Sequence, residues 1–450
     1  MQEFIHTVAR QYSLEHAFLL ALVGRRDAPR RRLLEEWASQ IDWCRFERIA
    51  SPELFAYLAH VLTETGLWSR CPPWLQEQFR NRQRFTAAQW LRWRLELQHI
   101  VQVFRAHGID LILLKGAVLT GTAYPTTSLR SMTDLDLLVR PGDAERALRL
   151  IELVGFRCPQ RFRFLPPHDD RRRFGPADAE VSVPLQKTGT RALIEVHTQL
   201  ESAEPWYPVS TAQLWKTAQH LDLCGLSCKT LERHEFLLHL IMHLSEHHLF
   251  EHGLRALLDV YLWIELHHGR IDWSWIAAEA TRRGYAQWVY LTLRLAHDAL
   301  ATPVPAEVFA SLRAPEQLEK VQQLAYEQIL AQGREINGVP RLLLFALAQP
   351  NVPEAARVLM GRLIPSRAAI PVAQLRSVAG PQLTGVRLAV RSVLNDMRSR
   401  IPQCYRAWRA GQLRWNSLKR AAGLVRSANQ LRELMLTQTR SATGADQCTR

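Results

Sequence analysis

The sequence predicts an α+β protein in which a small unit of strands and helices is flanked by helical regions. Apolar residues recur every three to four positions over residues 1–95 and again over residues 231–350, as expected for amphipathic helices. Between them, over residues 96–230, short apolar runs alternate with helical segments, a pattern typical of an α/β or α+β unit. Residues 351–450 form a fourth region, a basic extension interrupted by prolines.

The elements of the mixed region can be placed in order. A helix is expected to end at Gly108, because glycine suits the position that follows a helix. After it the sequence predicts a strand, a short helix, a second strand, a longer helix and a further strand, at residues 109–116, 117–125, 134–141, 142–156 and 191–200. Pro125 and Gly155 mark the ends of the two helices in this series.

The overall composition is that of a globular protein with two or three domains. The chain has 450 residues, of which 47% are hydrophobic and 22% charged. The sequence has no run of 18 apolar residues, and its first residues lack the pattern of a signal peptide, so we expect a cytoplasmic protein without a membrane span. Seven scattered cysteines do not form a disulfide framework, which agrees with a reducing compartment.

The positive charge is concentrated in the C-terminal extension. The formal net charge is +14, and residues 351–450 contain 17 Lys and Arg against four acids. This extension interleaves Tyr405, Trp408 and Trp415 with arginines, which is consistent with an anionic partner such as RNA, DNA, a membrane surface or an acidic protein. The alternative is an amphipathic helix with a solvated basic face, and no signature of an RRM or KH domain is present.

Two aspartates interrupt the apolar strand at residues 134–141. Asp134 and Asp136 project from the same face, while Leu135 and Leu137 face the opposite layer. Nearby carboxylates repel one another, and a divalent cation such as Mg²⁺ or Mn²⁺ would compensate both charges. The pattern therefore predicts a metal site for phosphoryl chemistry. Otherwise both acids reach solvent or pair with neighbouring arginines.

Three further positions fit such a site. Lys115 and Gly116 lie between a strand and a helix, where backbone N–H groups can receive a phosphate. Glu195 supplies a third acid within an apolar strand, and His197 lies on the same face, where it can orient the acid. Glu180 is a rival third acid, although its surroundings are less apolar.

This ordered set resembles the nucleotidyltransferase superfamily that includes DNA polymerase β. It is most similar to a bacterial branch known as uncharacterised nucleotidyltransferase family proteins. The residues that carry the resemblance are "LLKGAVL", "YPTTSLRSMTDLDLLVRP", "LVGF" and "IEVHTQL", with weaker support from "IDW" near the start and from the helical segment around residues 237–260. The resemblance spans about residues 40–275 and implies that residues 96–230 form a small mixed-sheet nucleotidyltransferase core.

The resemblance also implies roles for single residues. Asp134, Asp136 and Glu195 would hold Mg²⁺ and act in catalysis. Lys115 and Gly116 lie where the superfamily's glycine motif binds the triphosphate, but Ala117 replaces the usual serine or glycine, so one contact is missing.

Arg130 is a candidate to contact a phosphate across the site, or else it forms a surface salt bridge.

Histidines recur on the helix that follows the core. His239, His243 and His247 are spaced by four residues, with His248 and His252 nearby. Such spacing can hold a zinc ion, line a substrate cleft or simply cover one packing face of the helix.

Another residue of this region, Asp259, is expected to be a buried acid paired with Arg255 rather than a catalyst.

Two functions are consistent with the sequence. The first is an Mg²⁺-dependent nucleotidyltransferase that binds an NTP such as ATP, transfers its NMP to an unknown acceptor (protein, small molecule or RNA) and releases pyrophosphate. The second is a non-catalytic protein of the same fold that binds nucleic acid or an assembly partner through its basic tail.

Overall fold

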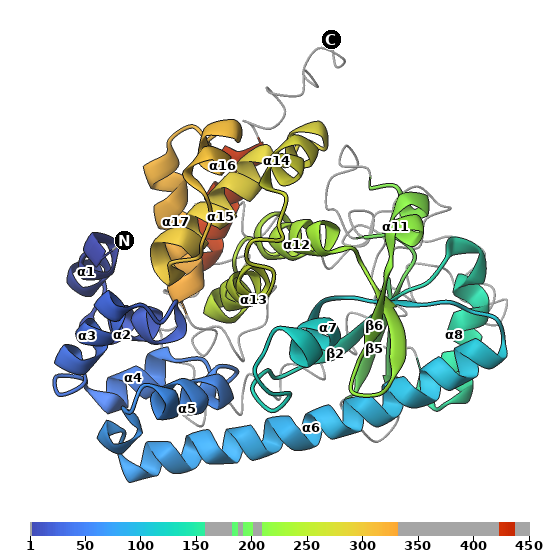
Figure 1. Cartoon of the computed structure of the whole chain (residues 1–450), viewed down its shortest axis with the longest axis horizontal. Helices are drawn as coiled ribbons and strands as arrows, with labels where there is room; N and C mark the ends of the chain where they lie inside the picture. The colour runs from blue at the N-terminus through green and yellow to red at the C-terminus, as the bar shows by residue number, and fades with distance from the viewer. Residues whose placement is uncertain (1, 158–181, 188–191, 201–208, 332–422, 437–450) are drawn as a thin grey trace, which may run out of the picture.

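A computed structural model of the chain describes residues 2–157, 182–187, 192–200, 209–331 and 423–436. It confirms an α+β fold with helical flanks: helices α1 to α5 lie at one end, a mixed sheet at the other, and a second group of helices covers both (Figure 1). Helices that precede the sheet in the sequence and helices that follow it therefore both pack around it.

The N-terminal helices form a bundle around α2. This helix is almost entirely buried, which matches its uniformly apolar sequence. Side chains cap several of these helices: Ser13, Asp27 and Asp42 each accept a hydrogen bond from a backbone N–H of the first turn. The helices are α1 (Gln2–Gln11), α2 (Leu14–Val23), α3 (Ala28–Trp37), α4 (Trp43–Ile49), α5 (Phe55–Glu64) and the short η1 (Trp68–Arg70).

One long helix, α6 (Pro73–Ala106), connects this bundle to the sheet. Its first half packs on α5, and its last turns run beneath the sheet and α8 (Ala144–Leu153) (Figure 1). The boundary expected between residues 95 and 96 therefore falls inside a continuous helix. Helical periodicity continues past this point, and no proline follows Pro73 before the helix ends near Gly108.

A seven-stranded mixed sheet forms the core, in the order β3-β4-β5-β2-β1-β7-β6. Its strands are β1 (Ile112–Leu113), β2 (Asp134–Leu138), β3 (Phe156–Arg157), β4 (Ser182–Lys187), β5 (Leu193–His197), β6 (Gln219–Asp222) and β7 (Ser227–Thr230). The pairs β2–β5 and β1–β7 are parallel, and the remaining neighbours are antiparallel. The three strands predicted from the sequence, β1, β2 and β5, lie at its centre.

The helices between the strands also match the predicted order. The short helix α7 (Lys115–Thr122) follows β1, and α8 follows β2 after a turn of 3₁₀ helix, η2 (Pro141–Asp143). Helix α11 (Thr211–Thr217) precedes the hairpin of β6 and β7.

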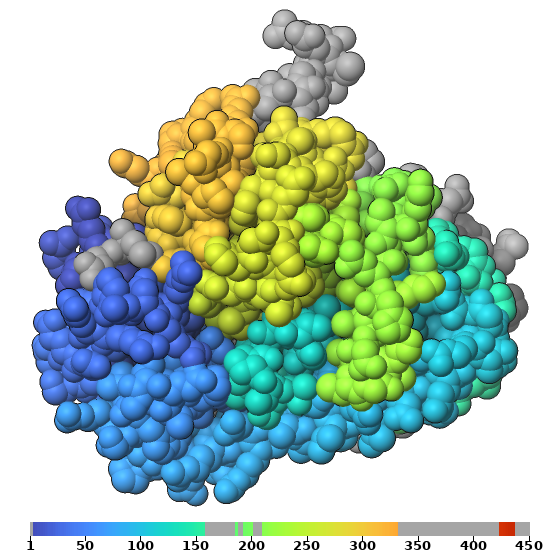
Figure 2. Space-filling view, viewed as in Figure 1, coloured from blue at the N-terminus to red at the C-terminus, as the bar shows by residue number. Residues whose placement is uncertain are grey.

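The C-terminal helices pack over α7. Helix α13 contacts α7 directly and also packs against α12, α15 and α17 (Figure 1). The space-filling view shows these helices in close contact with the strand region below them (Figure 2). The elements are α12 (Arg233–Met242), η3 (His243–His247), α13 (Gly253–Leu266), α14 (Trp273–Arg282), α15 (Ala286–Leu300), α16 (Ala306–Ser311) and α17 (Leu318–Leu330). The boundary expected between residues 230 and 231 lies between β7 and α12.

Part of the basic extension packs on this group. Residues 423–436 form a helix whose Leu431 and Met435 are fully buried, and Gln328 of α17 donates a hydrogen bond to the carbonyl of Leu424 at 2.8 Å. The aromatic residues Tyr405, Trp408 and Trp415 lie outside the described residues. Among the described helices, none combines the length and apolar character needed to cross a membrane.

Candidate active site

The parallel pairing of β2 and β5 places two of the predicted acids side by side. Asp136 is the direct register partner of Glu195, and Asp134 lies opposite Leu193 at the beginning of the same pair. Neighbouring strands are about 4.8 Å apart, so the carboxylates of Asp136 and Glu195 project from adjacent positions on one face. On the other face, Leu135 and Leu137 are buried, as the alternation of the sequence predicts.

The carboxylate of Asp136 is the centre of a polar cluster. Lys115 Nζ donates a hydrogen bond to Asp136 Oδ1 at 2.9 Å, and His197 Nε2 lies 2.9 Å from the same oxygen. His197 Nε2 is also 3.9 Å from Glu195 Oε2. Asp136 and His197 are buried, whereas the side chain of Glu195 remains 26% exposed. Glu195 is therefore the acid of this cluster that solvent can reach.

The two aspartates have opposite electrostatic environments. Burial alone would raise the pKa of Asp136, but the Lys115 ammonium and the hydrogen bond from His197 lower it below its ordinary value. Burial, followed by repulsion from Asp136, raises the pKa of Asp134. Neighbouring positive groups therefore compensate the negative charge of Asp136, whereas the negative charge of Asp134 is not fully compensated.

The start of α7 places Lys115 against Asp136. The backbone N–H of Leu114 donates to the carbonyl of Asp136 at 3.2 Å, which fixes the end of β1 beside β2. Lys115 then adopts a φ of +43°, a conformation that non-glycine residues rarely occupy. Such local strain persists where surrounding contacts hold it, and here the ion pair with Asp136 does so.

Gly116 leaves room for Arg130. A Cβ atom at position 116 would lie only 2.7 Å from Arg130 Nη1 and 3.5 Å from Met132 Cγ. The absence of a side chain here therefore allows a guanidinium group to approach the first turn of α7. Gly116 thus provides space for the charged side chain of Arg130.

Arg130 is held by a buried acid of α13. Its Nε and Nη2 atoms donate to the two oxygens of Asp259 at 2.9 and 2.8 Å, and Tyr124 also donates to Asp259 at 2.7 Å. Arg130 and Asp259 are both buried, so this is not the surface salt bridge that the sequence left open. Asp259 is a buried acid as predicted, and it lies 3.6 Å from Arg255, but its main partners are separated from it by more than 125 residues. Local spacing could not reveal them.

Arg255 connects the site to the N-terminal bundle. Its Nε donates to Glu53 at 2.6 Å, and this charge is the main reason that the pKa of Glu53 is lowered. Glu53 precedes α5, Arg255 lies in α13 and Arg130 belongs to the core. Three regions of the chain thus meet at the same charged network.

The arrangement of the acids fits a bound divalent cation. One ligand atom from each of Asp136, Glu195 and His197 lies within 4.8 Å of the others, and Asp134 begins the same strand face. Carboxylate oxygens are the ligands that hard divalent cations prefer. The cluster of one Asp, one Glu and one His therefore provides donor atoms for a divalent cation. Glu180, the rival third acid, lies outside the described residues.

Comparison with known proteins gives the family. A family model described as "Uncharacterised nucleotidyltransferase" matches residues 37–301, which is more than half of the chain. The chain belongs to this family. The match includes β2, β5, α7 and α13, and therefore every site residue described above. No curated protein and no solved structure matches the chain. A buried cluster of Asp, Glu and His in a nucleotidyltransferase family member fits a catalytic site.

Histidines of this nucleotidyltransferase family member gather around the end of α12, which stops at Met242 and is followed by the π-helical turn η3. The ring centroids of His239 and His243 are 6.2 Å apart and those of His243 and His247 are 5.8 Å apart, as their spacing predicts. The ring nitrogens that come together are those of His243, His248 and His252.

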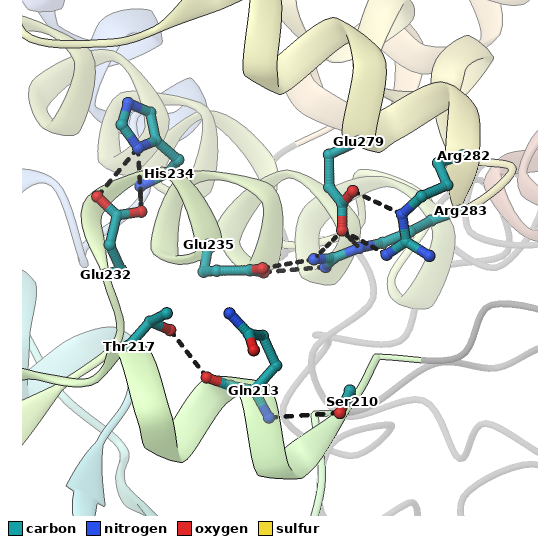
Figure 3. Close-up of polar contacts among 9 residues, drawn as sticks. All are labelled: Ser210, Gln213, Thr217, Glu232, His234, Glu235, Glu279, Arg282 and Arg283. Atoms are coloured by element: carbon teal, nitrogen blue, oxygen red, sulfur yellow. Dashed lines mark hydrogen bonds and ion pairs between the residues drawn. The ribbon is translucent and has the colours of Figure 1, made fainter.

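A polar cavity of about 380 Å³ lies between α11, α12 and α14 (Figure 3). Its charged lining residues are paired with one another: Arg283 contacts both Glu235 and Glu279, and Glu232 contacts His234. None of the three carboxylates of the candidate active site lines it.

Proposed function

We propose that this protein is an Mg²⁺-dependent nucleotidyltransferase, which transfers an NMP group from an NTP to the hydroxyl of an acceptor and releases pyrophosphate. The observation that carries the proposal is the register of β2 and β5, which puts Glu195 directly beside Asp136 on the face that also carries Asp134. Membership of the nucleotidyltransferase family supports the reaction class. ATP is the NTP that we propose first, and the cytoplasm is the proposed location.

The three acids would bind the cation. When bound, Mg²⁺ would supply neutralisation of the charge on the triphosphate and on the attacking and leaving oxygens. Asp134 fits this role because it lies on the same face of β2 as Asp136, and the repulsion between the two charges favours a positive partner. His197 keeps the carboxylate of Asp136 in place through its contact at 2.9 Å.

Glu195 is the proposed acceptor of the proton from the attacking hydroxyl. Its side chain is 26% exposed, so an acceptor molecule can reach it from solvent. The buried imidazole of His197 lies 3.9 Å from its oxygen and limits its orientation.

The phosphates would lie near the start of α7. The Lys115 ammonium, which contacts Asp136 at 2.9 Å, can transfer this contact to a phosphate oxygen when the cation takes over the carboxylate. Arg130 uses Nε and Nη2 for Asp259, and its Nη1 faces Gly116. This geometry supports a contact between Nη1 and a phosphate that approaches over the glycine.

The test is transfer of labelled NMP by the full-length protein. Each α-labelled NTP would be incubated with Mg²⁺ and pools of protein, RNA and small-molecule acceptors, and adducts would be identified by mass spectrometry. We expect Asp136→Asn to reduce transfer by about 100-fold or more, because several kcal/mol of charge stabilisation is lost. Asp110→Asn is the control, since Asp110 is exposed and pairs with Lys229. Undiminished transfer by Asp136→Asn would refute the mechanism.

A second candidate function is a non-catalytic protein of this fold, which binds nucleic acid or an assembly partner through residues 351–450. The strong positive charge of that extension favours it, as does Ala117 in place of the second small or hydroxyl residue of the glycine motif. Calorimetry separates the two functions: the enzyme binds MgATP, and its Asp136→Asn variant does so more weakly. A binding protein takes up RNA with strong salt dependence and ignores MgATP.

A further inference from the structure

We propose that His243, His248 and His252 form a second metal site, which binds a divalent transition metal such as Zn²⁺ and is separate from the carboxylates of β2 and β5. One ring nitrogen from each histidine lies within 4.8 Å of the others. Zinc–nitrogen bonds are about 2.0–2.1 Å long, so small side-chain rotations bring all three nitrogens into range of a single ion. The proposal goes beyond the nucleotidyl transfer described above.

The local backbone is shaped to gather these rings. The π-helical turn His243–His247 follows α12, and the chain then reverses through Leu249 and Phe250, which have φ values of +47° and +63°. Bulky residues rarely adopt this conformation, and π turns and such strained positions concentrate at functional sites. Phe250 is fully buried and anchors the reversal, which places His252 over His243.

The imidazole rings are in contact with one another. The ring centroids of His248 and His252 are 3.9 Å apart, those of His243 and His248 are 4.5 Å apart, and His243 stacks on His252 at 5.5 Å with an angle of 5° between the planes. His247 also contacts His248 at 4.5 Å. Protonated imidazoles would repel one another at these distances, so the packing favours neutral rings, which is the form that binds metals.

The electrostatic surroundings agree with neutral histidines. Burial lowers the pKa of His243 well below its usual value, with further effects from Lys115 and the neighbouring rings.

The nearby cations do not exclude a metal ion, because both are paired with acids. Lys115 contacts Asp136 at 2.9 Å, and Arg255 contacts Glu53 at 2.6 Å. Glu53 also acts on His252 with a charge that favours a cation there.

Three imidazoles select a particular class of metal. Nitrogen ligands suit Zn²⁺, Co²⁺, Ni²⁺ and Cu²⁺, whereas Mg²⁺ requires oxygen ligands. Three protein ligands leave a fourth position open on a tetrahedral ion, as in catalytic zinc sites. His252 is exposed, which provides a path for the metal from solvent.

Cobalt absorption tests the proposal directly. Full-length protein freed of metal with a chelator would be titrated with Co²⁺ in the presence of excess Mg²⁺, and the visible absorption of tetrahedral Co²⁺ recorded, with Zn²⁺ used in competition. We expect one equivalent of Co²⁺ to bind and Zn²⁺ to displace it. His248→Ala and His252→Ala should each weaken Co²⁺ binding by about 100-fold or more. Removal of a metal ligand lowers metal affinity more than removal of a residue that only hydrogen-bonds to a ligand.

The controls separate this site from the proposed active site. His268→Ala removes an exposed histidine beyond the end of α13 and should bind Co²⁺ like the wild type. Asp136→Asn should also retain the Co²⁺ signal, even where nucleotidyl transfer is lost. Because His252 is exposed, its variant tests binding without disturbing a buried position, and thermal melts check the fold of both histidine variants. Absence of tetrahedral absorption in the wild type, or equal affinity in the folded histidine variants, would overturn the proposal.

Discussion

The ion pair between Arg130 and Asp259 allows a quantitative test of how the helical region supports the site. Asp259→Asn removes the negative charge and retains the size and one oxygen acceptor of the side chain. Breaking a buried ion pair costs about 3–5 kcal/mol, because the remaining charge stays buried without compensation. The asparagine oxygen can still accept a hydrogen bond from Arg130 or Tyr124, which recovers about 1 kcal/mol. We therefore expect the free energy of unfolding to fall by about 2–4 kcal/mol.

Urea denaturation followed by tryptophan fluorescence would measure this change. The control is Asp298→Asn, which removes a partly exposed pair with Arg294 on one helix and should change the free energy by less than about 0.5 kcal/mol. Adding Arg130→Met to Asp259→Asn should restore at least half of the lost stability, since the uncompensated charge is then gone. Nucleotidyl transfer should be impaired in this double variant, because the Arg130 side chain proposed to contact a phosphate is absent. A loss below about 1 kcal/mol in Asp259→Asn would show that the reasoning is wrong.

Two further predictions concern Gly116 and Glu279. Gly116→Ala places a methyl group 2.7 Å from Arg130 Nη1, and the ion pair with Asp259 prevents this guanidinium from moving away. We therefore expect the free energy of unfolding, measured in urea, to fall by about 1–3 kcal/mol, and NTP binding, measured by calorimetry, to weaken. Unchanged values for both would contradict the role of this glycine. Hydrogen bonds from Arg282 and Arg283 lower the pKa of Glu279 from 4.5 to about 2, so its stabilising effect is complete above pH 4.5 and is lost as the pH falls toward 2. Glu279→Gln should therefore reduce the change in urea midpoint between pH 5 and pH 3, whereas the exposed Glu316→Gln should leave it as in the wild type.

The central strands could be predicted because their pattern is local. In β2 the alternation of acids and leucines reports directly which side chains face the core, and the apolar run that contains Glu195 does the same for β5. The remaining strands carry less information. β3 has only two residues, and β6 is mostly exposed, so neither produces a hydrophobic pattern that identifies a strand.

The sequence could predict that Asp136 and Glu195 lie close together, but not the contacts that surround them. Nothing in the local sequence links Arg130 to Asp259 or Arg255 to Glu53, because these contacts form only when helices distant in sequence pack together. The pairing of Lys115 with Asp136 likewise depends on the antiparallel register of β1 and β2. The histidine spacing predicted the ring contacts of His243 with His239 and His247, but not the chain reversal after the π turn that brings His252 over His243.

The continuity of α6 determines how this protein can be divided for biochemical work. A shortened protein that begins at residue 96 would lack two thirds of a 34-residue helix and would lose Trp90 and Trp93, which are buried. It would also remove Phe79, whose ring packs on Phe55 at 4.9 Å. A fragment intended to retain the candidate site should therefore keep the whole helix together with the bundle on which it rests, and it should also keep the helix of residues 423–436, whose Leu431 and Met435 are buried.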